Sequence, residues 1–143
     1  MNIKLIYSAI VLNNISSNIL KSYIVIGESS FKVYCDHITL KYGISSYPEM
    51  LGKNVKIKLE SICLSQYCQV AKVSFIDDEI KSICCNRIPH ITLSTDKNTK
   101  PSFSNVLLNE GKFISETNVS NIYLFGKIAV FTNNGWIYSK NEL

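Results

Sequence analysis

The sequence carries one tetrapeptide pattern twice, as His37-Ile38-Thr39-Leu40 and as His90-Ile91-Thr92-Leu93, and these copies contain both histidines of the chain. In an extended strand successive side chains point to opposite faces, so each histidine shares a face with the threonine two residues later. The isoleucine and leucine of each copy then point into a core. Two such strands brought together would gather two imidazoles and two hydroxyls, a set of groups suited to acid–base chemistry on a phosphate.

Alternating hydrophobic residues and turn residues predict the elements around these motifs. We expect strands over 3–11, 31–41, 55–59, 68–76, 88–94, 122–131 and 136–138. The sequence Asn133-Asn134-Gly135 predicts a hairpin turn between the last two strands. One helix is expected over 16–26, with a serine cap and a stop at Gly27, and a short one over 102–109, ending near Gly111. Residues 44–53 are expected to form a connection and 96–101 a polar loop, and Asp77-Asp78 is expected to begin a turn or a short polar segment.

The composition indicates one soluble globular domain over residues 1–143. Of the residues 46% are hydrophobic and 18% charged, and the length is sufficient for a sizeable core. The net charge of +4 suits an anionic ligand. The sequence lacks, however, the dense stripe of Lys and Arg that is typical of proteins that bind long duplexes. Abundant Ile, Asn, Lys, Ser and Tyr suggest an A+T-rich genome.

The cysteines and the start of the chain favour an intracellular protein. Five cysteines, two of them adjacent and none in a CxxC pair, fit free buried thiols better than a disulfide framework or a zinc site. The apolar start resembles a signal peptide, but no small-residue cleavage site follows and the run is too short to span a membrane. We therefore expect a first strand there, a cytoplasmic location and no membrane association.

Three other interpretations compete with a paired catalytic site. If only one His-x-Thr motif were present, the ordinary interpretation would be a structural, hydrogen-bonded histidine. Because both histidines of the chain occur in the same motif, a joint role is favoured. Two histidines are too few for catalytic zinc, and alternation predicts that Asp36 points away from His37, so no metal is expected. A nucleophilic triad is not expected, because the sequence has no Gly-x-Ser-x-Gly elbow and no cysteine next to either histidine.

The paired motifs resemble the two-histidine (2H) phosphoesterase superfamily, which includes LigT-like enzymes. The segment Pro89-His90-Ile91-Thr92-Leu93-Ser94-Thr95, followed by Lys100-Pro101 and Ser104-Asn105, is similar to the cyclic phosphodiesterase domain of fungal-type tRNA ligases. The resemblance extends from the first strand to the terminal hairpin. The stretch between the motifs is shorter than in many relatives, which suggests a trimmed lobe.

The resemblance implies an α+β fold of two pseudo-symmetric lobes, whose antiparallel sheets form a V-shaped cleft. It also implies cofactor-free and metal-independent cleavage of phosphodiesters next to a ribose 2′ or 3′ oxygen, with His90 as base and His37 as acid. An imidazole has an ordinary pKa of about 6.5, so one can be neutral and the other protonated near neutrality. Thr39 and Thr92 can hold the non-bridging oxygens of the phosphate.

Several residues near the motifs are candidates for substrate contacts. Lys41, Lys97 and Lys100 can add positive charge around the cleft, although exposed lysines are often plain surface. Ser94 follows the second motif. Candidates for stacking on bases, although strand aromatics usually belong to the core, are Tyr7, Tyr42, Phe103 and Trp136.

Three classes of function remain open. We expect first an enzyme that cleaves a 2′,5′-linked or cyclic nucleotide, with mixed-linkage cyclic GMP-AMP ahead of 2′,5′-oligoadenylate, in the role of a virus-encoded antagonist of immune signalling. The second class is RNA end healing, in which a terminal 2′,3′-cyclic phosphate is opened; the lack of a ligase or P-loop kinase sequence argues against it. The third, a non-catalytic RNA or nucleotide binder, conflicts with two complete motifs. A monomer acting on a small nucleotide, or alternatively on RNA ends, is expected.

Overall fold

The computed structural model describes residues 3–25 and 32–139, which form an α+β fold. The strands in these residues are β1 (Leu5–Leu12), β2 (Lys32–Val33), β3 (His37–Tyr42), β4 (Asn54–Leu64), β5 (Cys68–Phe75), β6 (His90–Thr95), β7 (Ser115–Asn118), β8 (Tyr123–Thr132) and β9 (Gly135–Ile137). The helices in these residues are α1 (Asn14–Lys21), α2 (Asp78–Ile83) and α3 (Phe103–Glu110). None of the described helices is long and apolar enough to cross a membrane.

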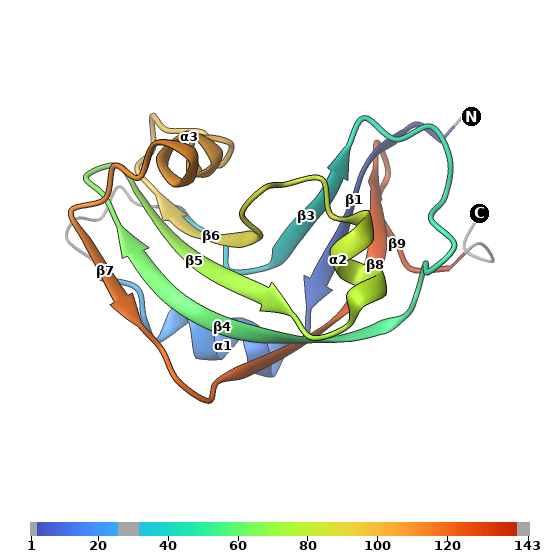
Figure 1. Ribbon diagram of the computed structural model, residues 1–143. Coiled ribbons are helices and arrows are strands. Elements are labelled where there is room, and N and C mark those ends of the chain that lie inside the picture. The colour runs from blue at the N-terminus through green and yellow to red at the C-terminus, as the bar shows by residue number, and fades with distance from the viewer. Residues whose placement is uncertain (1–2, 26–31, 140–143) are drawn as a thin grey trace.

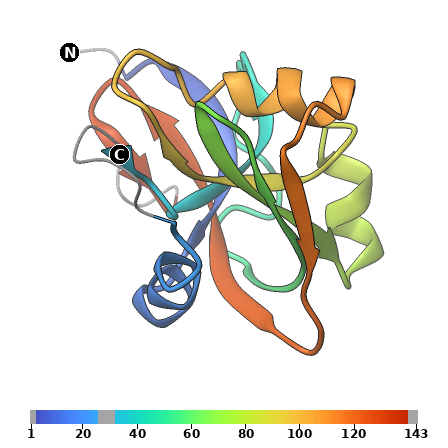
Figure 2. The same ribbon diagram turned by 90° about the vertical axis from the view of Figure 1, so that its left-hand side faces the viewer.

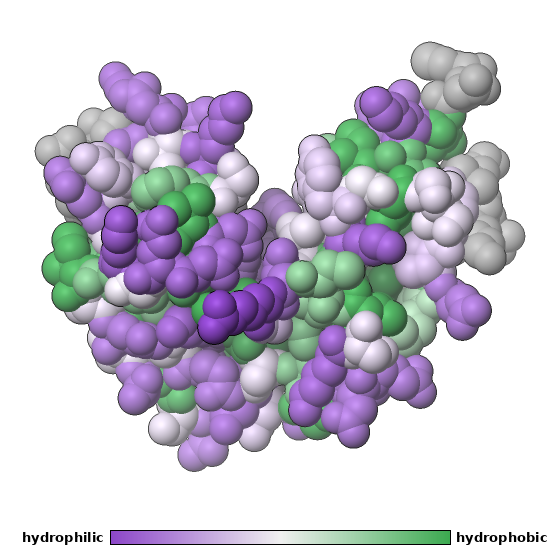
Figure 3. Space-filling view, turned by 45° about the horizontal axis from the view of Figure 1, so that its top comes forward, coloured by the Kyte–Doolittle hydropathy of each residue, from purple (hydrophilic) through white to green (hydrophobic). Residues whose placement is uncertain are grey.

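All the strands belong to one antiparallel sheet with the order β2-β6-β5-β4-β8-β1-β3, with β7 beside β4 and β9 beside β8. The sheet bends so strongly that β3, at one end of this order, also contacts β6, which is second from the other end. Figure 1 shows the result as a V, with β5, β6 and α3 in one arm and β1, β3 and β9 in the other. The space-filling view in Figure 3 shows a deep notch between the arms. The α+β architecture is confirmed, and its two lobes are the arms of one continuous sheet.

The main core lies on the face of the sheet that carries the apolar residues of the two motifs. Ile38, Leu40, Ile91 and Leu93 are all at most 1% exposed, as strand alternation predicts. Full burial of one such side chain contributes about 1.5–3 kcal/mol to stability. Helices α1 and α2 add side chains to this core and lie on opposite sides of the strands in Figure 2. The motifs thus turn their hydrophobic residues inward and leave the other face for chemistry.

A second, smaller apolar cluster holds α3 against β4 and β5. Leu107 and Leu108 of the helix pack with Cys63, Cys68 and Val70. The predicted helix over 102–109 is confirmed to within one residue, and it ends at Gly111, whose φ of 66° is the left-handed conformation that glycine adopts easily. This packing fixes the start of α3 beside β6.

The first helix differs from its prediction. It begins at Asn14, and its cap is Asn13, whose side chain accepts a 2.8 Å hydrogen bond from the Ser16 amide. The helix ends at Lys21, before the β-branched residues that were expected to continue it. Gly27, the predicted stop, lies outside the described residues.

The strand predicted over 31–41 is interrupted. Residues 34–36 separate β2 from β3, and Cys35 has a φ of 56°, a left-handed conformation that a strand does not contain. Phe31 lies outside the described residues. Because of this break, β3 begins at His37 itself.

Three further differences concern α2, β7 and β4. Asp77-Asp78 was predicted to begin a turn or a short polar segment, but Asp77 caps α2 by accepting a 2.9 Å hydrogen bond from the Glu79 amide. Strand β7 was missed because all its residues are exposed and lack alternation. Strand β4 runs to Leu64, well past the predicted end at residue 59. The predicted terminal hairpin is confirmed, with Thr132 paired to Gly135.

Candidate active site

Both histidines lie at the start of their strands, where the two arms of the V meet. The segment before β3 runs antiparallel to β6, with Val33 paired to Ser94 and the Cys35 amide donating to the Thr92 carbonyl at 3.1 Å. Strands β3 and β6, which begin at His37 and His90, also contact each other directly. The spacing of the two histidines is short enough for the charge of His37 to influence the titration of His90. The two motif histidines therefore share one site at the floor of the cleft.

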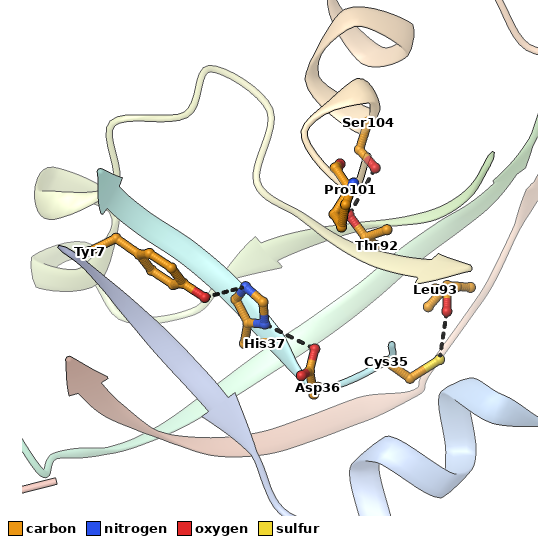
Figure 4. Close-up of polar contacts among 8 residues, drawn as sticks. All are labelled: Tyr7, Cys35, Asp36, His37, Thr92, Leu93, Pro101 and Ser104. Atoms are coloured by element: carbon orange, nitrogen blue, oxygen red, sulfur yellow. Dashed lines mark hydrogen bonds and ion pairs between the residues drawn. The ribbon is translucent and has the colours of Figure 1, made fainter. Parts of the chain in front are cut away.

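The His37 ring is held from both sides, as Figure 4 shows. Its Nδ1 lies 2.9 Å from the Asp36 carboxylate, and its Nε2 lies 3.5 Å from the Tyr7 hydroxyl. Burial raises the pKa of Asp36, but the hydrogen bond and charge of His37 and the backbone donors outweigh this, so the pKa lies below its ordinary value. An ionised carboxylate only accepts, and therefore Nδ1 carries the proton.

This position of Asp36 corrects the prediction that it points away from His37. That prediction assumed strand alternation, but Asp36 precedes β3 and follows the left-handed Cys35. Outside the strand the carboxylate is free to turn back onto the neighbouring imidazole. A carboxylate on Nδ1 is a common way of fixing the tautomer and orientation of a functional histidine.

The environment of His90 is different. The residue is only 7% exposed, and Nδ1 of its ring donates a 2.8 Å hydrogen bond to the carbonyl of Ile88. Burial lowers the pKa of His90 and outweighs the hydrogen bond to the Ile88 carbonyl, which raises it; the nearby His37 charge lowers it further. His90 is therefore neutral at neutral pH, with the Nε2 lone pair left to accept a proton. The nitrogen that faces away from the Nδ1 partner is thus Nε2 in both rings, and in His37 it lies beside the Tyr7 hydroxyl.

The two threonines of the motifs are held by different neighbours. The Thr92 hydroxyl lies 2.8 Å from the Ser104 hydroxyl at the start of α3 and 3.4 Å from the Pro101 carbonyl, as Figure 4 shows. Ser104 in turn lies 3.3 Å from the Cys68 sulfur. Thr39 is half-buried, and within the described residues its hydroxyl makes no hydrogen bond, while its carbonyl accepts one from Asn86.

Four aromatic rings, which we call the aromatic wall, line the site beside His37: Tyr7, Tyr42, Phe131 and Trp136. The Tyr7 ring stacks on His37 and on Tyr42, with centroid distances of 5.6 and 5.7 Å. Burial, and secondarily the Asp36 charge, raises the pKa of Tyr7 to about 12, so its hydroxyl keeps its proton. The Tyr42 ring is 73% exposed and extends the wall into solvent. Three of the predicted stacking residues thus gather around one histidine.

The other predicted contact residues lie elsewhere. Phe103 packs with the α3 cluster and lies 6.5 Å from the Tyr67 ring, at a separate pocket of about 590 Å³ that Lys100 also lines. Ser94 is fully buried, so its hydroxyl is closed to a ligand. Lys41 pairs with Ser8 next to a bulge in the β1–β3 ladder, and its neighbour Tyr42 lies opposite Tyr7. Lys97 is exposed in the loop before α3.

Sequence reasoning did not assign Asp36, Ser104 and Phe131 to the site. Asp36 adjoins a motif histidine, but alternation argued against it. Ser104 was noted only as part of the flanking resemblance, without a role. Phe131 reaches the wall through the pairing of β8 with β1, opposite Tyr7, and no local pattern predicts that pairing.

The comparisons agree with this geometry. The model of the fungal tRNA ligase phosphodiesterase domain matches residues 28–130, which include both His-x-Thr motifs. A search of curated proteins found no match. The chain therefore belongs to the family of fungal tRNA ligase phosphodiesterase domains, and it is a phosphodiesterase of the two-histidine type.

Proposed function

We propose that this protein opens a 2′,3′-cyclic phosphate at the end of an RNA strand, by hydrolysis without a metal ion. The observation that carries the proposal is the unequal pair of imidazoles, one neutral against the Ile88 carbonyl and one beside an ionised carboxylate. An acid and a base of the same residue type need such different surroundings to act together.

In the proposed reaction His90 is the base and His37 the acid. The His90 Nε2 takes a proton from a water molecule as its oxygen attacks the phosphorus. The bond from phosphorus to one ribose oxygen breaks, and the His37 Nε2 gives its proton to that oxygen. The Asp36 carboxylate, 2.9 Å from Nδ1, supplies the counter-charge that a protonated ring requires. The product is a phosphomonoester with a free neighbouring hydroxyl. Proton exchange with solvent then removes the proton from His90 and returns one to His37.

The threonine hydroxyls would stabilise the charge on the non-bridging oxygens. Ser104 can donate to Thr92, which leaves the Thr92 proton free to turn from the Pro101 carbonyl to a phosphate oxygen. Thr39 already has an uncommitted hydroxyl within the described residues. Donors placed in advance at developing charge are among the largest contributions to catalysis.

A second candidate substrate is a 2′,5′-linked nucleotide, such as mixed-linkage cyclic GMP-AMP or 2′,5′-oligoadenylate. The observation in its favour is that both arms carry aromatic surfaces, the aromatic wall on one and the Tyr67–Phe103 pocket on the other. A ligand with two bases could use both. We rank it second because the matching family is a domain of an RNA ligase. The role against immune signalling remains a prediction.

The deciding experiment offers purified protein three substrates in the presence of EDTA. These are an RNA with a terminal 2′,3′-cyclic phosphate, mixed-linkage cyclic GMP-AMP and 2′,5′-oligoadenylate, with products identified by mass spectrometry. We expect the RNA end to be opened fastest. Cleavage of only the 2′,5′-linked compounds would transfer the proposal to the second candidate, and no cleavage of any would refute both.

A further inference from the structure

A row of side chains connects the catalytic floor to a second surface of the sheet. His37 of β3 pairs with Val11 of β1, Val11 pairs with Lys127 of β8, and Lys127 pairs with Asn54 of β4. Directly paired residues project from the same face of a sheet. Because neighbouring strands lie about 4.8 Å apart, the row covers roughly 15 Å from His37 to Asn54. It leads to the middle of β8 and the start of β4, and from there β8 runs back to its first residue, Tyr123, at the bottom of Figure 1.

The surface at the end of this row is basic and aromatic. Phe125 pairs with Lys56, and Tyr123 pairs with Lys58. Phe125 is 47% and Tyr123 36% exposed, although both lie within a strand of the sheet. The Lys56 ammonium lies 4.5 Å from the centre of the Tyr123 ring. We call Lys56, Tyr123, Phe125 and Lys127 the basic face.

A hollow of about 710 Å³ adjoins the basic face. Besides Lys56, Phe125 and Lys127, it is lined by the polar residues Asn13, Asn54 and Tyr138 and by Val11, Leu12, Val55 and Gly126. Among the described residues that line it there is no Asp or Glu. Neither Lys56 nor Lys127 forms an ion pair within residues 3–25 and 32–139. Lys58, the cross-strand partner of Tyr123, lies 4.0 Å from the Glu60 carboxylate, whereas Lys53 and Lys72 pair with carboxylates at other places. The basic face thus keeps its positive charge available for an anion.

We infer that the basic face binds the single-stranded body of the RNA whose cyclic end lies between the histidines. This inference rests on the proposed function and extends it from the terminal phosphate to the nucleotides that precede it. Lysines that contact phosphates and aromatic rings that stack on bases are the combination used by single-strand binding surfaces. The alternation of Tyr123, Phe125 and Lys127 along β8 presents both kinds of group on one face. A small cyclic dinucleotide would not need this surface.

The test compares a double variant of the face with a control of equal charge. Lys56→Gln/Lys127→Gln removes two positive charges from the basic face, and Lys81→Gln/Lys112→Gln removes two exposed charges elsewhere. Fluorescence anisotropy measures binding of a labelled single-stranded RNA with a 3′-phosphate, over a range of salt. We expect the face variant to bind about tenfold more weakly, with a salt slope smaller by roughly 1.4, since each single-strand phosphate contact contributes about 0.7. Phe125→Ala should also weaken binding about tenfold, through lost stacking.

A second readout separates this inference from the proposed function. Hydrolysis of a mononucleoside 2′,3′-cyclic phosphate needs only the cleft, so it should be unchanged in the face variants. Wild-type RNA affinity in Lys56→Gln/Lys127→Gln, or an equal loss in the control, would overturn the inference even if cyclic ends are opened. RNA binding that depends on the face in a protein that opens no cyclic phosphate would support the surface and refute the proposed function.

Discussion

At the scale of single residues, the chemistry depends on the hydrogen-bond partner of Nδ1 in each imidazole. Burial lowers the pKa of His90 and makes it a neutral base, with the Ile88 carbonyl holding the proton on Nδ1, and the Asp36 carboxylate orients the His37 ring. The sequence predicted the face shared by each histidine and threonine, because strand alternation is a local property. It did not predict the Asp36 contact, because that contact depends on the left-handed backbone of Cys35, which is neither Gly nor Asn.

The pH dependence of catalysis should reflect the lowered pKa of His90. A base works only when it is deprotonated, so kcat/KM falls on the acid side as His90 gains a proton. Since burial keeps this pKa below the ordinary value of about 6.5, the acid limb should lie below pH 6.5. The measurement is kcat/KM on a 2′,3′-cyclic nucleotide from pH 4.5 to 9. An acid limb centred above pH 6.5, or a flat profile, would contradict the assignment of His90 as base.

Asp36→Asn should lower kcat while the protein stays folded, because the amide cannot supply the negative charge beside His37. We expect a loss of at least tenfold, within the roughly hundred- to ten-thousandfold that a general acid contributes. Steady-state kinetics and a thermal melt give the two readouts. Asp78→Asn, which removes the same charge from an exposed residue of α2, is the matched control. Equal turnover in both variants would remove Asp36 from the mechanism.

At the scale of elements, the site depends on where strands and helices begin. Strand β3 starts at His37, and α3 places Ser104 against Thr92 at its first turn. The sequence predicted α3 and its end at Gly111 from local signals. The docking of α3 depends on Leu107 and Leu108 meeting β4 and β5, which is a tertiary contact and could not be predicted from the helix alone.

Ser104→Ala should disturb Thr92 more than it disturbs the fold. We expect kcat to fall about tenfold, less than the roughly hundred- to thousandfold cost of removing a stabilising donor outright. Thr92→Val/Ser104→Ala should be no slower than Thr92→Val, because Ser104 acts through Thr92. Ser102→Ala, at the exposed start of α3 with no side-chain capping bond, serves as control. Independent, additive losses would show that Ser104 has a different role.

At the scale of the whole molecule, the site exists because the two ends of one sheet approach each other. Strand β3 lies at one end of the strand order and β6 is second from the other end, and the bend brings these two strands into contact. The repeated motif predicted that two such strands meet, whereas the bend itself is a property of long-range pairing. The aromatic wall likewise combines residues from β1, β3, β8 and β9, which no local pattern connects.

The most direct test of a shared two-histidine site is the turnover of His37→Ala, His90→Ala and the double variant. The substrate is an RNA with a terminal 2′,3′-cyclic phosphate, in EDTA, with folding checked by circular dichroism. We predict that each single variant loses roughly a hundred- to ten-thousandfold in kcat, and that the double variant is little slower than either, since the two groups act as a unit. Normal turnover in either folded single variant, or wild-type activity abolished by EDTA, would contradict the account.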